Sequence, residues 1–111
     1  MGRGQGSNPE QAVTASIIIR PAAEADIQEA HDWYERKRPG LGVTFVTRVD
    51  EGLDKLRRSP DLGILVHKQL RRLAVDRFPY GIFYVIEGER IIVVGVIHGR
   101  RAPRHWKRRL P

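Results

Sequence analysis

The sequence contains no cysteine, which excludes disulfide bonds and metal sites built from thiolates. It also has no apolar run near the roughly 18 residues that a membrane-spanning helix needs. The longest dense apolar stretch, residues 91–97, has the length of a strand instead. Residues 1–16 include an arginine but no apolar centre, so they do not resemble a secretory signal. We therefore expect a cytoplasmic protein that does not associate with membranes.

The composition that remains is that of a small basic domain. A chain of 111 residues of which 41% are hydrophobic is long enough for one modest core. Lysine and arginine number 20 against 13 acidic residues, which gives a net charge of +7. Such an excess favours association with polyanions or acidic proteins. Three classes of partner follow from it: RNA in the ribosome, DNA, or an acidic protein chain.

The first half of the chain predicts a leader, a short strand and two helices. Residues 1–16 are rich in Gly, Ser, Gln and Asn, so we expect a flexible leader before a single domain at residues 17–111. The β-branched run at residues 16–20 predicts a strand. Apolar residues recur at helical spacing over residues 22–38 and 41–59, on either side of Pro39 and Gly40. Two helices joined by so tight a break form a helical hairpin.

The second half changes to the period of strands. Residues 60–69 are expected to connect the second helix to a strand at residues 70–78. Two further strands are predicted at residues 81–87 and 90–98, and the continuous apolar character of the last indicates a central strand buried on both faces. A short basic helix is expected near residues 103–109. The predicted order is β-α-α-β-β-β with a possible C-terminal helix.

One combination of motifs resembles a known family. The run RFPYGIFYV at residues 77–85, the apolar strand at 91–97, HGRR at 98–101 and Trp106 together look like the RelE/ParE toxins, over about residues 17–106. The resemblance implies an α+β fold in which a small, curved antiparallel sheet packs against an α-helical hairpin. It also implies the toxin component of a type II toxin–antitoxin system, neutralised by a co-expressed antitoxin.

The family divides by target, and the resemblance leaves the target open. RelE-like members cleave mRNA in the ribosomal A site, whereas ParE-like members inhibit DNA gyrase and have no known nuclease activity. The FPY and HGRR motifs resemble those of ParE-like members more closely, which makes gyrase the leading candidate target. The alternative is a ribosome-dependent, metal-independent endoribonuclease. A third hypothesis, from another class, is a non-toxic basic protein that binds nucleic acid.

If the protein is a nuclease, its candidate catalytic residues are Arg77, His98, Arg100 and Arg101. Guanidinium groups offer planar, permanently charged donors for a phosphorane. A histidine with a pKa near its ordinary value of about 6.5 exchanges a proton near neutrality. The competing interpretation is a solvated basic face with a histidine that only bonds the strand end.

Candidates for target binding or nucleic-acid contact form a wider set: Lys68, Arg71, Arg72, Tyr80, Arg100 and Arg101. Tyr80 is expected either to stack on a base or to pack in its turn, whereas Tyr84 fits the core better because it shares a strand face with Ile82 and Ile86. Trp33 is expected to be a packing anchor. Without cysteine or an HxH or HExxH pattern, we expect no metal site and no cofactor.

The expected partner is a cognate acidic antitoxin, which would make the functional state a hetero-oligomer. A peptide gains apolar contacts most readily at a helical hairpin or a sheet edge. The candidate docking regions are therefore the second helix around Val46 and an edge strand at residues 70–75. The net charge of +7 would steer an acidic chain toward the toxin.

Overall fold

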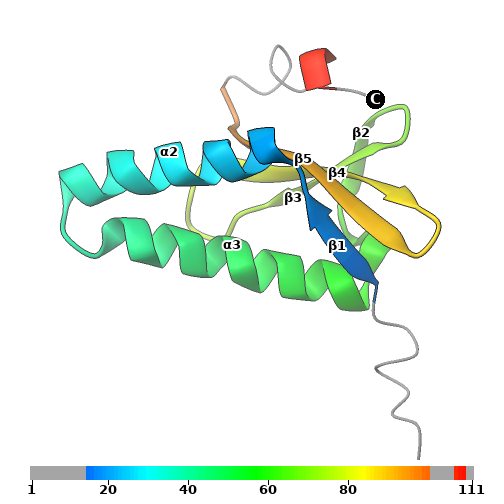
Figure 1. The fold of residues 1–111 in the computed structure, drawn as a ribbon, viewed down its shortest axis with the longest axis horizontal. Helices are drawn as coiled ribbons and strands as arrows, with labels where there is room; N and C mark the ends of the chain where they lie inside the picture. The colour runs from blue at the N-terminus through cyan, green and yellow to red at the C-terminus, as the bar shows by residue number, and fades with distance from the viewer. Residues whose placement is uncertain (1–14, 101–106, 110–111) are drawn as a thin grey trace, which may run out of the picture.

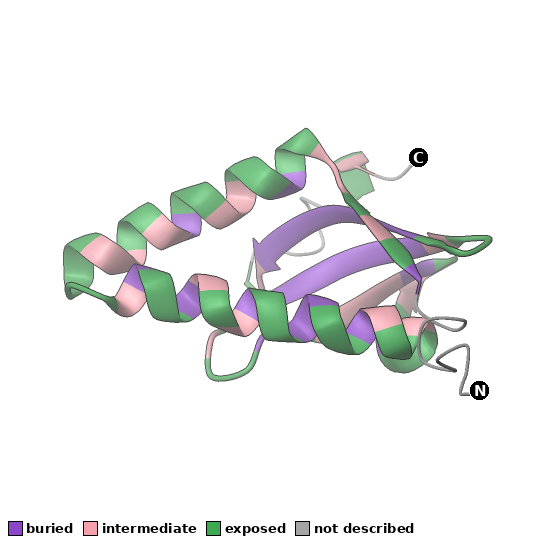
Figure 2. Ribbon diagram, turned by 60° about the horizontal axis from the view of Figure 1, so that its bottom comes forward, coloured by how far each residue is buried: buried purple, intermediate pink, exposed green. Residues whose placement is uncertain are grey.

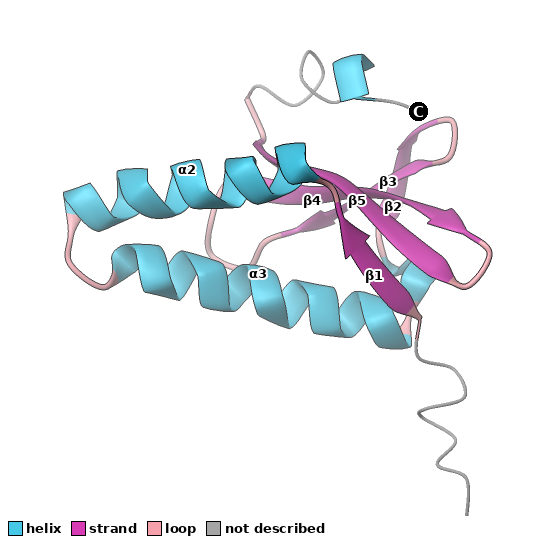
Figure 3. Ribbon diagram, in the orientation of Figure 1, coloured by secondary structure: helices cyan, strands magenta, loops and turns pink. Residues whose placement is uncertain are grey.

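Two helices pack on one face of a five-stranded sheet in the computed structural model, which describes residues 15–100 and 107–109 (Figures 1 and 3). The elements run in the order β1 (Ser16–Ile19), α2 (Pro21–Lys37), α3 (Leu41–Arg58), the short 3-10 helix η1 (Pro60–Leu62), β2 (Ile64–His67), β3 (Leu70–Ala74), β4 (Tyr80–Glu87) and β5 (Arg90–His98). The expected α+β class, with a helical hairpin against a small sheet, is confirmed. None of the helices in these ranges is long and apolar enough to cross a membrane.

The helical hairpin turns where the sequence predicts a break. Helix α2 begins at Pro21, whose missing N–H costs nothing in the first turn. Gly40 stands between the helices with a φ of 89°, a left-handed conformation that glycine adopts without strain. The Glu35 carboxylate accepts the backbone N–H groups of Gly40 at 2.7 Å and Gly42 at 2.9 Å. The carboxylate thus satisfies donors that the start of α3 would otherwise leave open.

The strand order is β1-β5-β4-β3-β2, and one pairing differs from the expected antiparallel sheet. Strand β1 runs parallel to β5, with Ile17 opposite Ile91 and Ile19 opposite Val93. The other neighbouring pairs are antiparallel. The helical hairpin lies between β1 and the rest of the sheet in sequence, and a connection of that length allows the parallel pairing that a tight turn forbids. The sheet is therefore mixed.

Strand β2 lies inside the segment that was expected to be only a connection. Its four residues, Ile64–His67, pair antiparallel with β3. So short a run, between η1 and a tight turn, carries too few alternations to stand out in the sequence. Strand β3 also ends at Ala74, earlier than predicted. Because β2 covers β3, the expected edge strand at residues 70–75 is an interior strand, and that prediction is wrong.

The core fills both faces of the central strands (Figure 2). On the helix face, Val93 and Ile82 pack against Phe45 and Leu56 of α3. On the opposite face, Phe83 and its neighbours form a second apolar cluster: Leu70, Val85, Ile92, Val94 and Ile97. All residues of β5 from position 91 to position 97 are buried, so the predicted central strand is confirmed.

Candidate functional site

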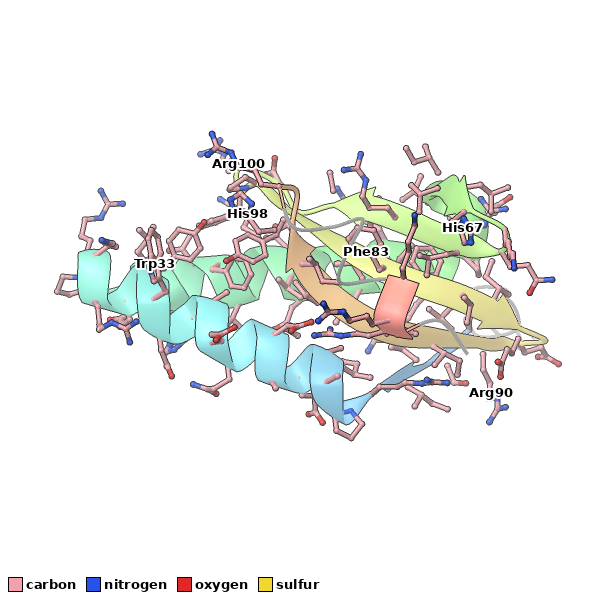
Figure 4. The ribbon with its side chains drawn as sticks, turned by 90° about the horizontal axis from the view of Figure 1, so that it is seen from above. Trp33, His67, Phe83, Arg90, His98 and Arg100 are labelled. Carbon is pink, nitrogen blue, oxygen red and sulfur yellow. The ribbon has the colours of Figure 1, made fainter. Side chains whose placement is uncertain are left out.

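The loop after β3 lies beside the turn that follows β5. The backbone N–H of Gly99 donates to the Pro79 carbonyl at 2.8 Å, and Tyr80 is the strand partner of His98. This places four of the sequence-predicted site residues at one end of the sheet, and we call the group the basic end: Arg77, Tyr80, His98 and Arg100. Figure 4 shows His98 and Arg100 together there, with Trp33 of α2 beside them and Arg90 and His67 far away.

Aromatic packing fixes the position of Tyr80 within the basic end. Its ring meets the His98 ring edge-on, with centroids 5.2 Å apart, and meets the Phe45 ring in the same way at 5.0 Å. Tyr34 of α2 contacts Tyr80 as well, at 6.1 Å. Tyr80 is half-buried by these contacts. It therefore joins the core to the surface and holds the His98 ring against the sheet.

His98 uses one of its ring nitrogens within the turn. The backbone N–H of Arg100 donates to His98 Nδ1 at 3.1 Å. A nitrogen that accepts a hydrogen bond carries no proton, so the neutral imidazole bears its proton on Nε2. The bond also ties Arg100 to the strand end. His98 thus has a structural role in the turn whatever else it contacts.

The cations of the basic end point into solvent. Arg77 has a left-handed backbone with a φ of 68°, and its side chain is 77% exposed. Its ion pair with Asp76 is 3.9 Å long, a surface contact that contributes little. Arg100 is exposed too. Arg101 lies outside the described residues. The exposed guanidinium groups are available to a partner without rearrangement of the fold.

The remaining predicted site residues lie elsewhere. Opposite residues of an antiparallel pair share a face, so Arg71 beside Tyr84 faces the helices and Arg72 beside Phe83 faces away from them. Lys68 lies in the turn between β2 and β3, at the opposite end of β3 from the basic end. The structure therefore does not bring these three cations to the surface formed by the basic end.

Arg71 and Arg72 are engaged with the fold itself. Arg71 donates to the Gly63 carbonyl at 2.8 Å and to the Asp61 carbonyl at 3.2 Å. The Arg72 side chain packs closely over Gly81. A Cβ atom added at Gly81 would lie 2.8 Å from the Cγ of Arg72. Its Nε is buried without a hydrogen-bond partner among the described residues. Arg71 in particular braces the segment that leads into β2.

The structure confirms the predicted burial of Tyr84 but not the predicted packing role of Trp33. Tyr84 is fully buried, as predicted; its hydroxyl donates to the Pro60 carbonyl at 2.6 Å and accepts the Gly63 N–H at 2.8 Å. Burial raises the pKa of Tyr84 above its usual value, against a smaller opposing effect of the Gly63 hydrogen bond. Trp33 is not the packing anchor that was predicted. It is 47% exposed, and Lys37 Nζ lies 4.7 Å from its ring centroid.

One feature near the basic end had no signal in the sequence. Strand β1 accompanies β5 only to about Val93, which leaves the next part of the β5 edge without a strand partner. There Asp26 of α2 accepts the Val96 N–H at 3.0 Å, and Arg109 bonds both oxygens of Asp26. Arg109 also donates to the Val94 carbonyl at 3.3 Å, and the Asp26 hydrogen bond raises the pKa of Arg109. Two ion-paired side chains from segments far apart in the sequence thus bond the part of the β5 backbone that no neighbouring strand pairs with.

A groove runs between α2 and the end of β5. Its lining includes Trp33, Tyr80, His98, Arg100 and Arg109. Within residues 15–100 and 107–109, no three histidine, aspartate or glutamate side chains come together in a way that could hold a metal ion. The lining also holds the carboxylates of Asp26 and Glu29, so the groove combines aromatic side chains with charges of both signs.

Comparisons with known proteins identify the family. Residues 17–103 match the family described as the ParE toxin of the type II toxin–antitoxin system, parDE. A solved chain from the chromosomal ParDE TA system of P. aeruginosa has a similar fold, with a TM-score of 0.68 at 19% identity, over 77% of this chain and 96% of that chain. No curated protein matches this chain. Because the family match spans well over half of the sequence, the chain belongs to the ParE toxins of type II toxin–antitoxin systems.

Proposed function

We propose that this toxin arrests growth by binding DNA gyrase in the cytoplasm, and that a cognate acidic antitoxin neutralises it. The observation that carries the proposal is the match to the ParE family over residues 17–103. Within the described fold, the surface that we assign to the target is the basic end. Its two exposed arginines, Arg77 and Arg100, lie on adjoining turns at one end of a packed sheet.

The arrangement of side chains supports binding over chemistry. A ribosome-dependent nuclease needs an acid, a base and phosphate-binding cations around one reacting phosphate. Here Arg71 is occupied by two backbone carbonyls, and the Tyr84 hydroxyl is buried between Pro60 and Gly63. His98 Nδ1 is occupied by the Arg100 N–H. These contacts favour a toxin that binds its target through exposed cations.

A supercoiling assay with purified gyrase tests the proposal directly. We expect the toxin to inhibit supercoiling and to leave cleaved DNA, and we expect its induction in cells to cause filamentation and an SOS response. Rapid translational arrest with codon-phased mRNA cuts, and no effect on gyrase, would contradict the proposal and favour the RelE-like alternative.

A pair of variants locates the target surface. We expect Arg100→Ala combined with Arg101→Ala to weaken gyrase inhibition at least about tenfold, because each substitution removes a positive charge that would complement an acidic target. The matched control is Arg90→Ala, an arginine whose side chain is 56% exposed at the far end of the sheet (Figure 4). Equal inhibition by the double variant and the control would exclude the basic end as the target surface.

A further inference from the structure

The turn that follows β5 is closed by a side chain that acts as a backbone acceptor. His98 Nδ1 accepts the N–H of Arg100, two residues further along the chain, at 3.1 Å. Asparagine and aspartate close turns in the same way, through a side-chain oxygen that accepts the N–H two residues on. The imidazole of His98 therefore takes the place of such an oxygen. It differs from the oxygen in one respect, because it accepts only while Nδ1 carries no proton.

The ring of His98 is held in the position where it makes this bond. The Tyr80 ring meets it edge-on with centroids 5.2 Å apart, and Tyr80 is itself packed against Phe45 at 5.0 Å. His98 is half-buried, whereas Gly99 and Arg100 are exposed. The core thus fixes the imidazole, and the imidazole in turn fixes the exposed turn that carries Arg100, a cation of the basic end.

The charges around the His98 ring already sum to a positive excess. The titratable side chains that line the groove with His98 include one ion pair, Asp26 with Arg109. The others come from α2, β4 and the turn itself: Glu29, Tyr34, Arg36, Tyr80 and Arg100. The adjoining loop adds Asp76 and Arg77, which pair with each other at 3.9 Å. The groove lining thus holds two carboxylates and three guanidinium groups, so a proton on His98 would increase the positive excess.

We propose that His98 is a positioning residue for target binding: its unprotonated Nδ1 orders the turn that carries Arg100, and a proton on that nitrogen releases the turn. A protonated imidazole has N–H groups at both ring nitrogens, so the Arg100 N–H would lose its acceptor and meet a donor. Histidine side chains in general gain this proton as pH falls below about 6.5. The affinity for the target should therefore fall as the pH is lowered. The inference rests on the proposed function only where gyrase is the readout.

Two substitutions separate the hydrogen bond from the ring. His98→Asn keeps an acceptor for the Arg100 N–H but has no ring, whereas His98→Phe keeps a ring against Tyr80 but has no acceptor. We expect His98→Phe to bind gyrase about fivefold more weakly than His98→Asn at about pH 8, since one hydrogen bond contributes about that factor. Equal affinities would overturn the proposal. Weaker binding by the asparagine variant would overturn it too, because the ring itself would then be the group that contacts the target.

The dependence of binding on pH tests the role of the proton. We expect the wild-type toxin to bind gyrase about fivefold more weakly at about pH 5.5 than at about pH 8, because the turn loses one hydrogen bond. His98→Asn cannot titrate at this position, so the same measurements with this variant correct for the response of gyrase itself to pH. A ratio of wild-type to variant affinity that does not change between the two pH values would contradict the proposal.

NMR spectroscopy of the toxin alone tests the turn without gyrase. We expect the Arg100 amide proton to shift upfield as the pH falls, with the same midpoint as the His98 ring protons, because it loses its acceptor. The same spectra show whether each variant is folded. An Arg100 amide that does not follow the His98 ring would overturn the proposal. If the wild-type toxin fails to bind gyrase at any pH, the proposed target is wrong, while this titration still decides whether His98 controls the turn.

Discussion

Replacing Tyr84 with phenylalanine removes a buried hydroxyl that makes two hydrogen bonds to the segment before β2. The Tyr84 ring is fully buried and remains so in phenylalanine, so no apolar contact is lost. The missing hydroxyl bonds the Pro60 carbonyl and the Gly63 N–H, which belong to η1 and the residue that precedes β2. The substitution therefore tests how far one buried hydroxyl holds that segment against the sheet.

The expected loss follows from the two bonds. A hydrogen bond contributes about 1 kcal/mol net, and a buried donor left without an acceptor costs about 1–3 kcal/mol. Gly63 is itself buried, so its N–H has no route to water unless β2 shifts. We expect Tyr84→Phe to lower the free energy of unfolding by about 2 kcal/mol. For a domain of this size that corresponds to a fall in Tm of roughly 8–16 °C.

Urea denaturation followed by circular dichroism measures the change. The matched control is Tyr34→Phe, because Tyr34 is also packed among aromatic rings but its hydroxyl bonds no described residue. The control is expected to lie within about 0.5 kcal/mol of the wild type. A loss for Tyr84→Phe no larger than that of the control would refute the reasoning, since it would mean that the segment before β2 is not held by this hydroxyl.

Three other predictions concern the same fold. Burial raises the pKa of Tyr84 in the folded protein, so as pH rises past the ordinary tyrosine pKa of about 10 this tyrosine loses its proton first in the unfolded state. The free energy of unfolding should therefore fall as pH rises through that range. Urea titrations at alkaline pH should show a shallower fall for Tyr84→Phe. Gly95→Ala should cost about 1–2 kcal/mol, because the new Cβ would lie 2.8 Å from Arg109 Nη1; an unchanged urea midpoint would contradict this contact. Asp26→Asn should lower the free energy of unfolding by about 1–3 kcal/mol, since it leaves the Arg109 charge without its carboxylate partner. In a protein that already carries Arg109→Ala, Asp26→Asn should not cause this loss.

Much of the fold was predictable because its signals are local. Pro39 and Gly40 mark the break between two periodic apolar stripes, and the structure places α2 and α3 on either side of it. The continuous apolar run of β5 predicts burial on both faces, which the structure confirms. The motifs around Arg77 and Arg100 indicated the family, and their segments do adjoin. Each of these inferences needs only residues that are near one another in sequence.

The sequence by itself determined the helical hairpin, the buried central strand, the family and the excess of positive charge, because periodicity, turn residues and composition are written in consecutive positions. Only the tertiary structure decided that β1 runs parallel to β5, that β2 covers β3, and that Arg71, and not Arg72, lies on the helix face of the sheet. It alone exposed Trp33 and joined Asp26 to Arg109. Such features depend on which distant segments pack together, and the free energy of that packing is a property of the whole chain.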